Sequence, residues 1–277
     1  MLIDTHCHLD ASAFEGCGAQ VAAEACALGV QQIIVPAVCR SNFSQVASLG
    51  RFGGYTLGIH PVFVPAATAD DLLFLRDAAA TAMHDPYFVG IGEIGLDFFI
   101  PDLCQSAMRD KQTFFYAQQL QIAREFGLPV LLHSRRSVDQ ILKQLRLIPV
   151  IGGIAHAFNG SVQQAGMLIN AGFKLGFGGA CTFSRALHLR RLVTELPLSA
   201  LVLETDAPDM PPAWLHSSSA VHSPTVNSPV HLLGIAEVIA ELRAIPLALL
   251  AAQTTQNACA VLPRLQLSHY PDNGVAG

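Results

Sequence analysis

Eight short apolar segments recur along the chain, with helical segments between them. None of the eight alternates regularly between polar and apolar residues, which is typical of strands buried on both faces of a parallel sheet. Eight strand–helix units predict an α/β fold of the TIM type, a closed (β/α)8 barrel. The predicted strands are at residues 2–3, 30–38, 55–59, 87–91, 129–132, 150–155, 173–177 and 201–204. The predicted helices are at residues 18–28, 70–83, 105–126, 138–147, 162–171, 187–196, 230–242 and 247–260.

The composition suits one large barrel domain. Of the 277 residues, 51% are hydrophobic and 13% are charged, so the chain can bury an extensive core. Apolar runs stay below the roughly 18 residues of a transmembrane helix, and the N-terminus lacks the basic and apolar segments of a signal peptide. We therefore expect a cytoplasmic protein that makes no membrane contact, with one barrel domain at 1–265 and a flexible tail at 266–277. A long loop containing the serines at 217–219 is a candidate mobile lid.

Cysteine usage and net charge exclude two classes of protein. The seven cysteines are scattered and contain no C-x-x-C pair, which indicates reduced thiols rather than a disulfide framework or a cysteine-rich zinc module. The formal net charge is −5, so the chain offers no generally basic surface to nucleic acid. A phosphate-containing substrate would therefore be held locally, by metal ions and a few arginines.

His6 and His8 stand two residues apart at the end of the first predicted strand. In an extended backbone residues i and i+2 point to the same side, so both imidazoles face one spot and Cys7 points away. Imidazole nitrogen is a good ligand for zinc and for related divalent metals. The alternative is a pair of surface histidines, and the later strands decide between the two interpretations.

Further residues that can bind metal occur at the carboxyl ends of later predicted strands. Because the carboxyl ends of parallel barrel strands share one face, where active sites lie, we expect these side chains to converge. Such repeated placement is hard to obtain by chance, and it is the strongest indication of a metal centre in the sequence. The residues are His60, Glu93, His133, His156 and Asp206.

Two carboxylates have candidate catalytic roles. Glu93 lies between glycines, which let the backbone come close to a ligand, and its carboxylate can bridge two cations. The alternative for Glu93 is a helix cap or a salt bridge. Asp206 can bind a metal, accept a proton from metal-bound water, or simply cap the following turn. Glu204 precedes Asp206 by two residues and shares its side, either as a substrate contact or as a support for the ligands.

Polar groups beside these residues are candidate substrate contacts. Arg135 can hold a phosphate in bidentate fashion, although a solvated arginine is the alternative, and Arg136 fits that alternative better. Asn159 lies between His156 and the start of a predicted helix, which is a natural anion site. His60 either touches substrate or packs above the barrel.

Six ordered motifs extend from residue 3 to about residue 260. They read I-D-T-H-C-H-L-D (3–10), G-I-H-P (58–61), G-E-I-G-L-D (92–97), L-P-V-L-L-H-S-R (128–135), H-A-F-N-G (156–160) and L-E-T-D-A-P (203–208). Together they resemble the TatD family of metal-dependent hydrolases, which are commonly described as deoxyribonucleases. The resemblance implies a barrel of the amidohydrolase type with a divalent metal centre. It also implies that the metal ligands are His6, His8, Glu93, His133, His156 and Asp206, with Glu93 bridging.

Three features depart from the family pattern. After the last predicted strand the family usually reads D-x-P-Y-L, whereas this chain has Asp209 and Met210 in place of the Y-L pair. Val62 stands where the family often has a second histidine after G-I-H-P. Val226 stands where a basic residue usually precedes the N-x-P motif at 227–229. These departures leave the metal centre untouched. They count against nucleic acid as the substrate, because the basic residue replaced by Val226 could have contacted phosphate.

Together these features predict a hydrolase that uses one or two divalent cations per chain, zinc first and otherwise manganese or magnesium. The predicted activity is that of a deoxyribonuclease, which hydrolyses phosphodiester bonds through metal-activated water. One alternative is an amidohydrolase-like enzyme acting on small amides, lactones or phosphoesters, which the acidic net charge favours, and another is a non-catalytic metal-binding protein. The predicted partners are DNA or such a small substrate, and no obligate protein partner is implied.

Overall fold

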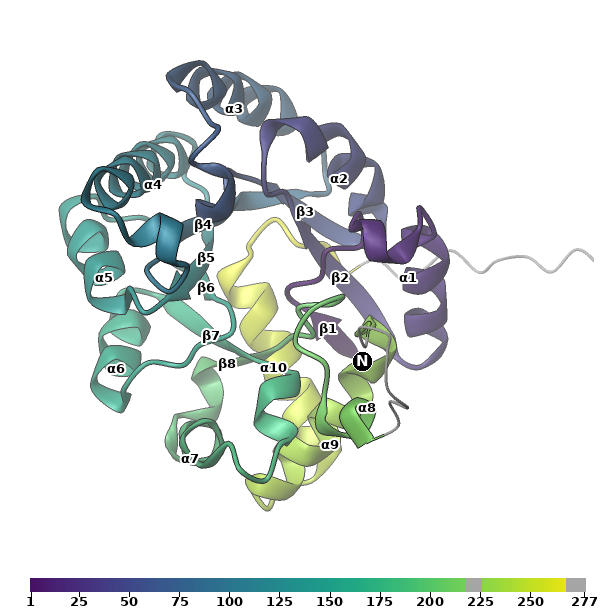
Figure 1. Ribbon diagram of the computed structural model, residues 1–277. Helices are drawn as coiled ribbons and strands as arrows, with labels where there is room; N and C mark the ends of the chain where they lie inside the picture. The colour runs from purple at the N-terminus through teal and green to yellow at the C-terminus, as the bar shows by residue number, and fades with distance from the viewer. Residues whose placement is uncertain (218–225, 268–277) are drawn as a thin grey trace, which may run out of the picture.

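Eight parallel strands form a ring, and α-helices surround it (Figure 1). The structure is a computed structural model that describes residues 1–217 and 226–267. Each strand pairs in parallel with the next strand along the chain, so the predicted (β/α)8 barrel is confirmed. The strands are β1 (Leu2–Asp4), β2 (Val30–Pro36), β3 (Gly53–Leu57), β4 (Phe88–Asp97), β5 (Val130–Arg135), β6 (Gly153–Ala155), β7 (Phe173–Phe177) and β8 (Leu201–Leu203).

The helices cover the outside of the strands, and most of the buried apolar side chains lie between the two layers. α4 ends at Phe126 and is followed by Gly127, whose φ of 63° belongs to the left-handed region that commonly terminates a helix. In the described part of the chain the α-helices are α1 (Gly18–Ala27), α2 (Phe43–Leu49), α3 (Ala69–Ala82), α4 (Ser106–Phe126), α5 (Val138–Leu147), α6 (Val162–Asn170), α7 (Leu187–Glu195), α8 (Ala213–Ser217), α9 (Leu232–Leu242) and α10 (Leu247–Val261).

The ring closes between β1 and β8 through backbone hydrogen bonds. The amide of Thr5 donates to the carbonyl of Leu203 at 3.0 Å, and the amide of Asp206 donates to the carbonyl of His6 at 2.9 Å. The amide of His8 donates to the carbonyl of Ala207 at 2.8 Å. Closure of the barrel thus places the segment after β1 against the segment after β8.

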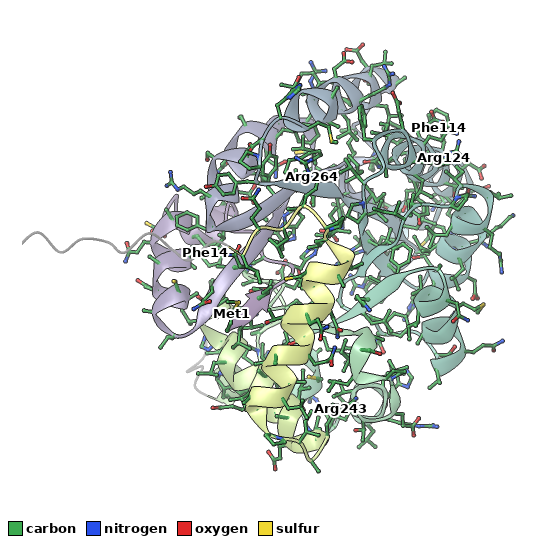
Figure 2. All side chains as sticks on the ribbon, turned by 180° about the vertical axis from the view of Figure 1, so that it is seen from behind. Met1, Phe14, Phe114, Arg124, Arg243 and Arg264 are labelled. Atoms are coloured by element: carbon green, nitrogen blue, oxygen red, sulfur yellow. The ribbon has the colours of Figure 1, made fainter. Side chains whose placement is uncertain are left out.

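α10 closes the amino-terminal end of the barrel (Figure 2). Its residue Val261, and Leu262 just after it, pack against side chains inside the ring such as Ile3, Ile34 and Leu131. The hydroxyl of Thr255 on α10 donates to the carbonyl at the start of the chain, next to β1. This apolar plug leaves the carboxyl end of the barrel as the open end.

β4 and β5 are longer than the sequence analysis predicted. β4 continues to Asp97 because it stays paired with β5, with Gly95 opposite His133 and Asp97 opposite Arg135. Glu93 and His133 therefore lie within their strands rather than after them. A Cβ atom on Gly95 would lie 1.9 Å from the carbonyl oxygen of His133. The glycines around Glu93 thus serve the packing of β4 on β5, and the predicted reason, close approach of a ligand, was wrong for Gly95.

Parts of two predicted segments lie outside the described residues. Ser217 ends α8, whereas Ser218 and Ser219 of the candidate lid are not described, and neither are residues 268–277 of the predicted tail. The domain boundary at residue 265 therefore stays a prediction. Among the described residues, no helix combines the length and the apolar character needed to cross a bilayer.

Arg264 ties the segment after α10 to the start of β4. Its guanidinium donates to the carbonyl oxygens of Phe88 at 2.6 Å and of Met83 and Asp85 at 3.0 Å each. We expect Arg264→Ala to lower the free energy of unfolding by about 2–3 kcal/mol, because three carbonyl groups lose a charged donor. Urea denaturation measures this change, and Arg124→Ala on the exposed side of α4 is the matched control (Figure 2). Equal urea midpoints for Arg264→Ala and Arg124→Ala would show that the contacts of Arg264 contribute nothing to the free energy of unfolding.

Candidate metal centre

Seven side chains identified in the sequence converge at the open end of the barrel. Six of them line a cavity of about 1310 Å³, and the seventh, His6, is fully buried beneath it. They come from the strands themselves or from the residues that directly follow them, as the barrel geometry requires. The seven are His6 and His8 after β1, His60 after β3, Glu93 in β4, His133 in β5, His156 after β6 and Asp206 after β8.

One side of the centre consists of His6, His8 and Asp206 around one oxygen of Glu93. Oε2 of Glu93 lies 3.1 Å from Nε2 of His6 and 3.5 Å from Nε2 of His8. Oδ1 of Asp206 lies 3.6 Å and 3.7 Å from the same two nitrogens. The two imidazole nitrogens are themselves only 3.3 Å apart. These nitrogen and oxygen atoms therefore face one common point.

The other side consists of His60, His133 and His156 around the second oxygen of Glu93. Oε1 lies 2.9 Å from Nε2 of His156, 3.0 Å from Nδ1 of His133 and 3.4 Å from Nε2 of His60. Nδ1 of His60 accepts a hydrogen bond from the amide of Val62, which aims its Nε2 at Glu93. His60 thus belongs to the cluster more closely than the sequence analysis expected.

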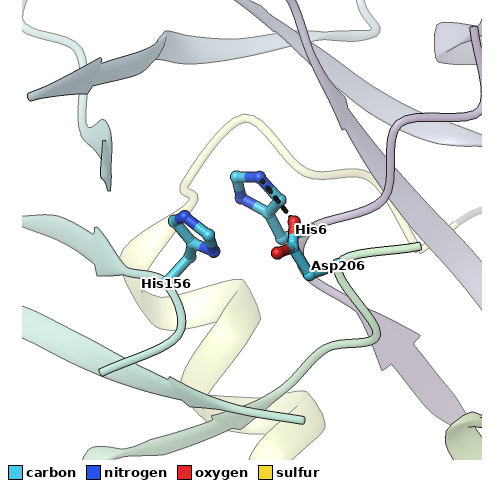
Figure 3. A group of neighbouring side chains, drawn as sticks. All are labelled: His6, His156 and Asp206. Carbon is cyan, nitrogen blue, oxygen red and sulfur yellow. Dashed lines mark ion pairs between the residues drawn. The ribbon is translucent and has the colours of Figure 1, made fainter. Parts of the chain in front are cut away.

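His6, His156 and Asp206 connect the two sides of the centre (Figure 3). The rings of His6 and His156 stack with centroids 3.9 Å apart and planes 14° apart. One ligand atom from each of the three residues lies within 4.8 Å of the others. The two sides of the centre are therefore adjacent, with the carboxylate of Glu93 between them.

Burial and neighbouring charges set the protonation of the cluster. Burial would raise the pKa of Glu93, but the imidazoles of His60, His156 and His6 lower it well below its usual range. Burial lowers the pKa of His6 to about 3 and that of His60 to about 4. Burial would also lower the pKa of His156, but the charges of Glu93 and Asp206 raise it to about 10, and hydrogen bonds to Asp97 and Glu93 raise the pKa of His133. Glu93, His6 and His60 therefore have the protonation that metal binding requires, whereas His156 must lose its proton to bind a cation.

The donor set fits divalent cations. The Nε2 atoms of His6 and His8 are too close for both to carry a hydrogen, so at least one of them directs a lone pair into the space between them. Within the described residues, the Nδ1 atoms of His6 and His156 are buried and have no hydrogen-bond partner. His, Glu and Asp side chains could hold one cation on each side of Glu93, and this mixed set suits zinc, manganese or magnesium.

Asp97 supports the centre, and the sequence analysis assigned it no role. Its buried side chain places Oδ2 3.4 Å from Nε2 of His133. Its Oδ1 accepts the amides of Phe99 and Ile100 at 2.8 Å and 3.2 Å. Asp97 follows Glu93 by four residues in one strand, so strand parity, which puts both on one face, was the signal that could have identified it.

Asp4 is a second support that the sequence analysis missed. Its Oδ1 accepts the amides of His6 and Thr205, and the Thr205 hydroxyl donates to its Oδ2. Burial raises the pKa of Asp4 to about 7, against the lowering effect of these hydrogen bonds. The carboxyl group of Asp4 thus joins Thr205 to the backbone of His6 across the seam between β1 and β8. Its position two residues before His6 placed it on the same strand face, which was the available signal.

The structure does not bring Glu204 to the cavity, so its predicted substrate contact is wrong. The side chain is 1% exposed and lies behind His156, with Oε1 3.9 Å from its Nδ1. Oε1 also accepts the amide of Ala157 at 2.6 Å. The alternative interpretation, a support for the ligands, agrees with this position. The barrel packs Glu204 between β8 and Gly176 of β7, where a Cβ atom would overlap the carboxylate.

The other predicted substrate contacts do line the cavity. Arg135 and Asn159 are exposed there, close to His133 and His156 in the chain. Arg136, which the sequence analysis interpreted as solvated, also lines the cavity and packs over the ring of Phe99.

A (β/α)8 barrel with imidazole and carboxylate groups gathered at its carboxyl end, where they could hold metal ions, is typical of the class of metal-dependent hydrolases. The family model described as "TatD related DNase" matches residues 3–263. The chain belongs to this TatD family.

Three relatives illustrate the similarity. An uncharacterized metal-dependent hydrolase of Haemophilus influenzae is 35% identical over 265 residues, which are 93% of this chain and 98% of the relative. The 3'-5' ssDNA/RNA exonuclease TatD of a Pantoea species is 30% identical over 264 residues, 93% of this chain and 97% of the relative. The crystal structure of YJJV, a TatD homolog from Escherichia coli K12, matches with a TM-score of 0.85 and 34% identity, covering 95% of this chain and 98% of the other.

The arrangement around Glu93 predicts how metal content responds to substitution. We expect the wild-type protein to bind about two cations per chain, one on each side of Glu93. Glu93→Gln should weaken both by about 100-fold, because the amide removes the negative charge shared by the two cations and replaces one of the two oxygens with an NH2 group that cannot bind a cation. His8→Ala should weaken only the cation on its own side. Equilibrium dialysis with zinc or manganese, followed by elemental analysis, measures the stoichiometry.

His84→Ala is the matched control, because His84 lies just after α3 and does not line the cavity. If His8→Ala and Glu93→Gln lowered the number of bound cations to the same extent, the two-sided arrangement would be contradicted.

Proposed function

We propose that the protein is a deoxyribonuclease that hydrolyses phosphodiester bonds, with His6, His8, Glu93, His133, His156 and Asp206 as ligands of one or two divalent cations, zinc first among them. The observation that carries the proposal is the carboxylate of Glu93, whose two oxygens face two separate groups of ligand atoms. Paired cations are common in enzymes that cleave phosphate esters, because they stabilise both the attacking and the leaving oxygen. The name of the Pantoea relative, an exonuclease, supports the same substrate class.

Bound cations would supply Lewis acidity and lower the pKa of water toward neutrality. In the proposal Asp206 orients the attacking water and accepts its proton, since its carboxylate is 14% exposed and lines the cavity. Glu93 is 2% exposed, so its part is to hold the two halves of the centre together. The imidazoles fix the remaining geometry from four different strand ends.

Substrate binding falls to polar side chains on the cavity wall. Arg135 is exposed beside His133, and a guanidinium group can hold two phosphate oxygens at once. Asn159 follows His156 and can donate its amide hydrogens to a phosphate or a sugar. His60 is 12% exposed on the same wall and can contact the substrate beside Glu93.

Asp206→Asn should lower kcat by about 100- to 10,000-fold, because the amide cannot accept the proton of the attacking water. Circular dichroism and elemental analysis show whether the fold and the bound metal persist in the variant. Asp209→Asn is the matched control, since this exposed carboxylate lines the same cavity outside the cluster and its loss should change kcat little. Full turnover by metal-loaded Asp206→Asn would refute the proposed role.

The substrate class is tested directly on the purified wild-type protein. We expect zinc-, manganese- or magnesium-loaded protein to cleave single-stranded DNA and bis(p-nitrophenyl) phosphate, and a chelator to abolish both activities. The same samples are offered a panel of amides and lactones, the substrates of the rival enzyme class. Hydrolysis of an amide or a lactone without any phosphodiester cleavage would replace the proposal with that rival.

A further inference from the structure

Three arginines form part of the cavity wall beside the metal centre. They are Arg109 from α4, Arg135 at the end of β5 and Arg136 just after it. All three are exposed, and the described residues that line the cavity include no other arginine and no lysine. Six carboxylates line the same cavity, so the positive charge is confined to the part of its wall formed by the end of β5 and the first turn of α4.

Two neighbouring phenylalanines hold these guanidinium groups. The guanidinium carbon of Arg135 lies 3.7 Å from the centre of the Phe99 ring, and that of Arg136 lies 4.6 Å from the same centre. The guanidinium of Arg109 lies 4.3 Å from the ring centre of Phe98. A guanidinium stacked on an aromatic ring keeps its N–H groups available at its edge. We call Phe98, Phe99, Arg109, Arg135 and Arg136 the arginine wall.

The three guanidinium groups have no carboxylate partner among the described residues. The arginine ion pairs within residues 1–217 and 226–267 are instead those of Arg40, Arg76 and Arg191. An arginine that is stacked but not neutralised can bind an anion at little further cost in side-chain order.

The backbone is arranged so that two adjacent arginines reach one ring. Successive residues of a strand point to opposite sides, so Arg135 and Arg136 would normally diverge. Arg136 instead has a φ of 55°, in the left-handed region that residues other than glycine seldom adopt. This turn brings both guanidinium groups over Phe99.

The arginine wall is also fixed to the metal centre. Asp97, which contacts His133, accepts the amide of Phe99 with its other oxygen. The amide of Phe98 donates to the carbonyl of Arg135 at 2.8 Å. An anion bound on the wall would therefore be held at a set distance from the cluster of ligands.

We propose that the arginine wall binds a second phosphate group of the substrate strand, next to the phosphodiester that is hydrolysed. This inference rests on the proposed function and adds a substrate preference to it: a nucleic acid carrying a phosphate beside the scissile one. Phe99 is a positioning residue, because it holds the guanidinium groups without itself contacting the reacting atoms. Arg135 lies closest to the ligands in the chain and serves the scissile phosphate, whereas Arg136 and Arg109 serve its neighbour.

The test compares a dinucleoside monophosphate with its two singly phosphorylated forms, one phosphorylated at each end. All three contain the same phosphodiester bond, so the chemistry at the metal centre is held constant. We expect metal-loaded wild-type protein to show about a tenfold higher kcat/KM for one phosphorylated form than for the unphosphorylated one, since a charge-assisted contact is gained. Arg136→Gln and Phe99→Ala should each reduce this preference, because Arg109, which stacks on Phe98, is then the main remaining contact to the second phosphate.

A salt titration and a double variant separate positioning from structural damage. For binding of a single-stranded oligothymidylate, Arg136→Gln should reduce the slope of log Kd against log salt concentration by about 0.7, the value for one lost phosphate contact. Phe99→Ala combined with Arg136→Gln should lose no more preference than Arg136→Gln alone, because both remove the same contact. Phe99→Leu keeps the apolar bulk without the ring and guards against a folding defect.

Phe114→Ala and Arg124→Gln are the matched controls, since both residues lie on α4 away from the cavity (Figure 2). They should keep the wild-type preference. Wild-type protein that cleaves all three dinucleotides equally, or variants that retain the preference, would overturn the arginine wall and leave the proposed function standing. Wild-type protein that cleaves none of them, and no single-stranded DNA, would overturn both.

Discussion

The carboxylate of Glu93 is the group on which the rest of the centre depends. It is 2% exposed, and imidazoles from the ends of β1, β3, β5 and β6 lie around it. Desolvation of a buried, ionised carboxylate costs roughly several kcal/mol unless neighbouring groups compensate its charge. In the absence of metal, a protonated His156, whose pKa is raised to about 10, can compensate part of this charge. Divalent cations on both sides would complete the compensation, so the stability of this end of the barrel and its chemistry have the same physical basis.

The barrel explains why residues so distant in sequence can satisfy that requirement. Each strand contributes at most a few side chains to the open end, and α10 fills the opposite end with apolar residues. The seam between β1 and β8 is held by backbone bonds and by Asp4, which connects His6 to Thr205. The contacts that close the ring therefore also bring together His6, His8 and Asp206, which form one side of the centre. A fault at the seam would separate His6 from Asp206.

Much of this arrangement follows from the sequence because two simple rules apply. Parallel strands share a carboxyl edge, and alternate residues share a face; together these rules single out His6, His8, Glu93, His133, His156 and Asp206. The rules do not say how deep a side chain lies. Glu204 fulfils them and yet is buried behind His156, whereas Asp97 was missed because β4 was predicted to end before Glu93. The position of Arg136 depends on a single left-handed residue in a loop, which no periodic pattern records.

The charge distribution of this acidic chain is compatible with the anionic substrate that we propose. Long-range attraction cannot help, because the net charge is −5 and salt screens it beyond about 10 Å. Recognition must then act at contact distance, where two bound cations would reverse the sign of the centre and stacked guanidinium groups would extend the positive region along one wall. The basic residue missing at Val226 therefore matters less than the sequence alone suggests. Its role can pass to arginines that come from β5 and α4, on the side of the cavity where His133 lies.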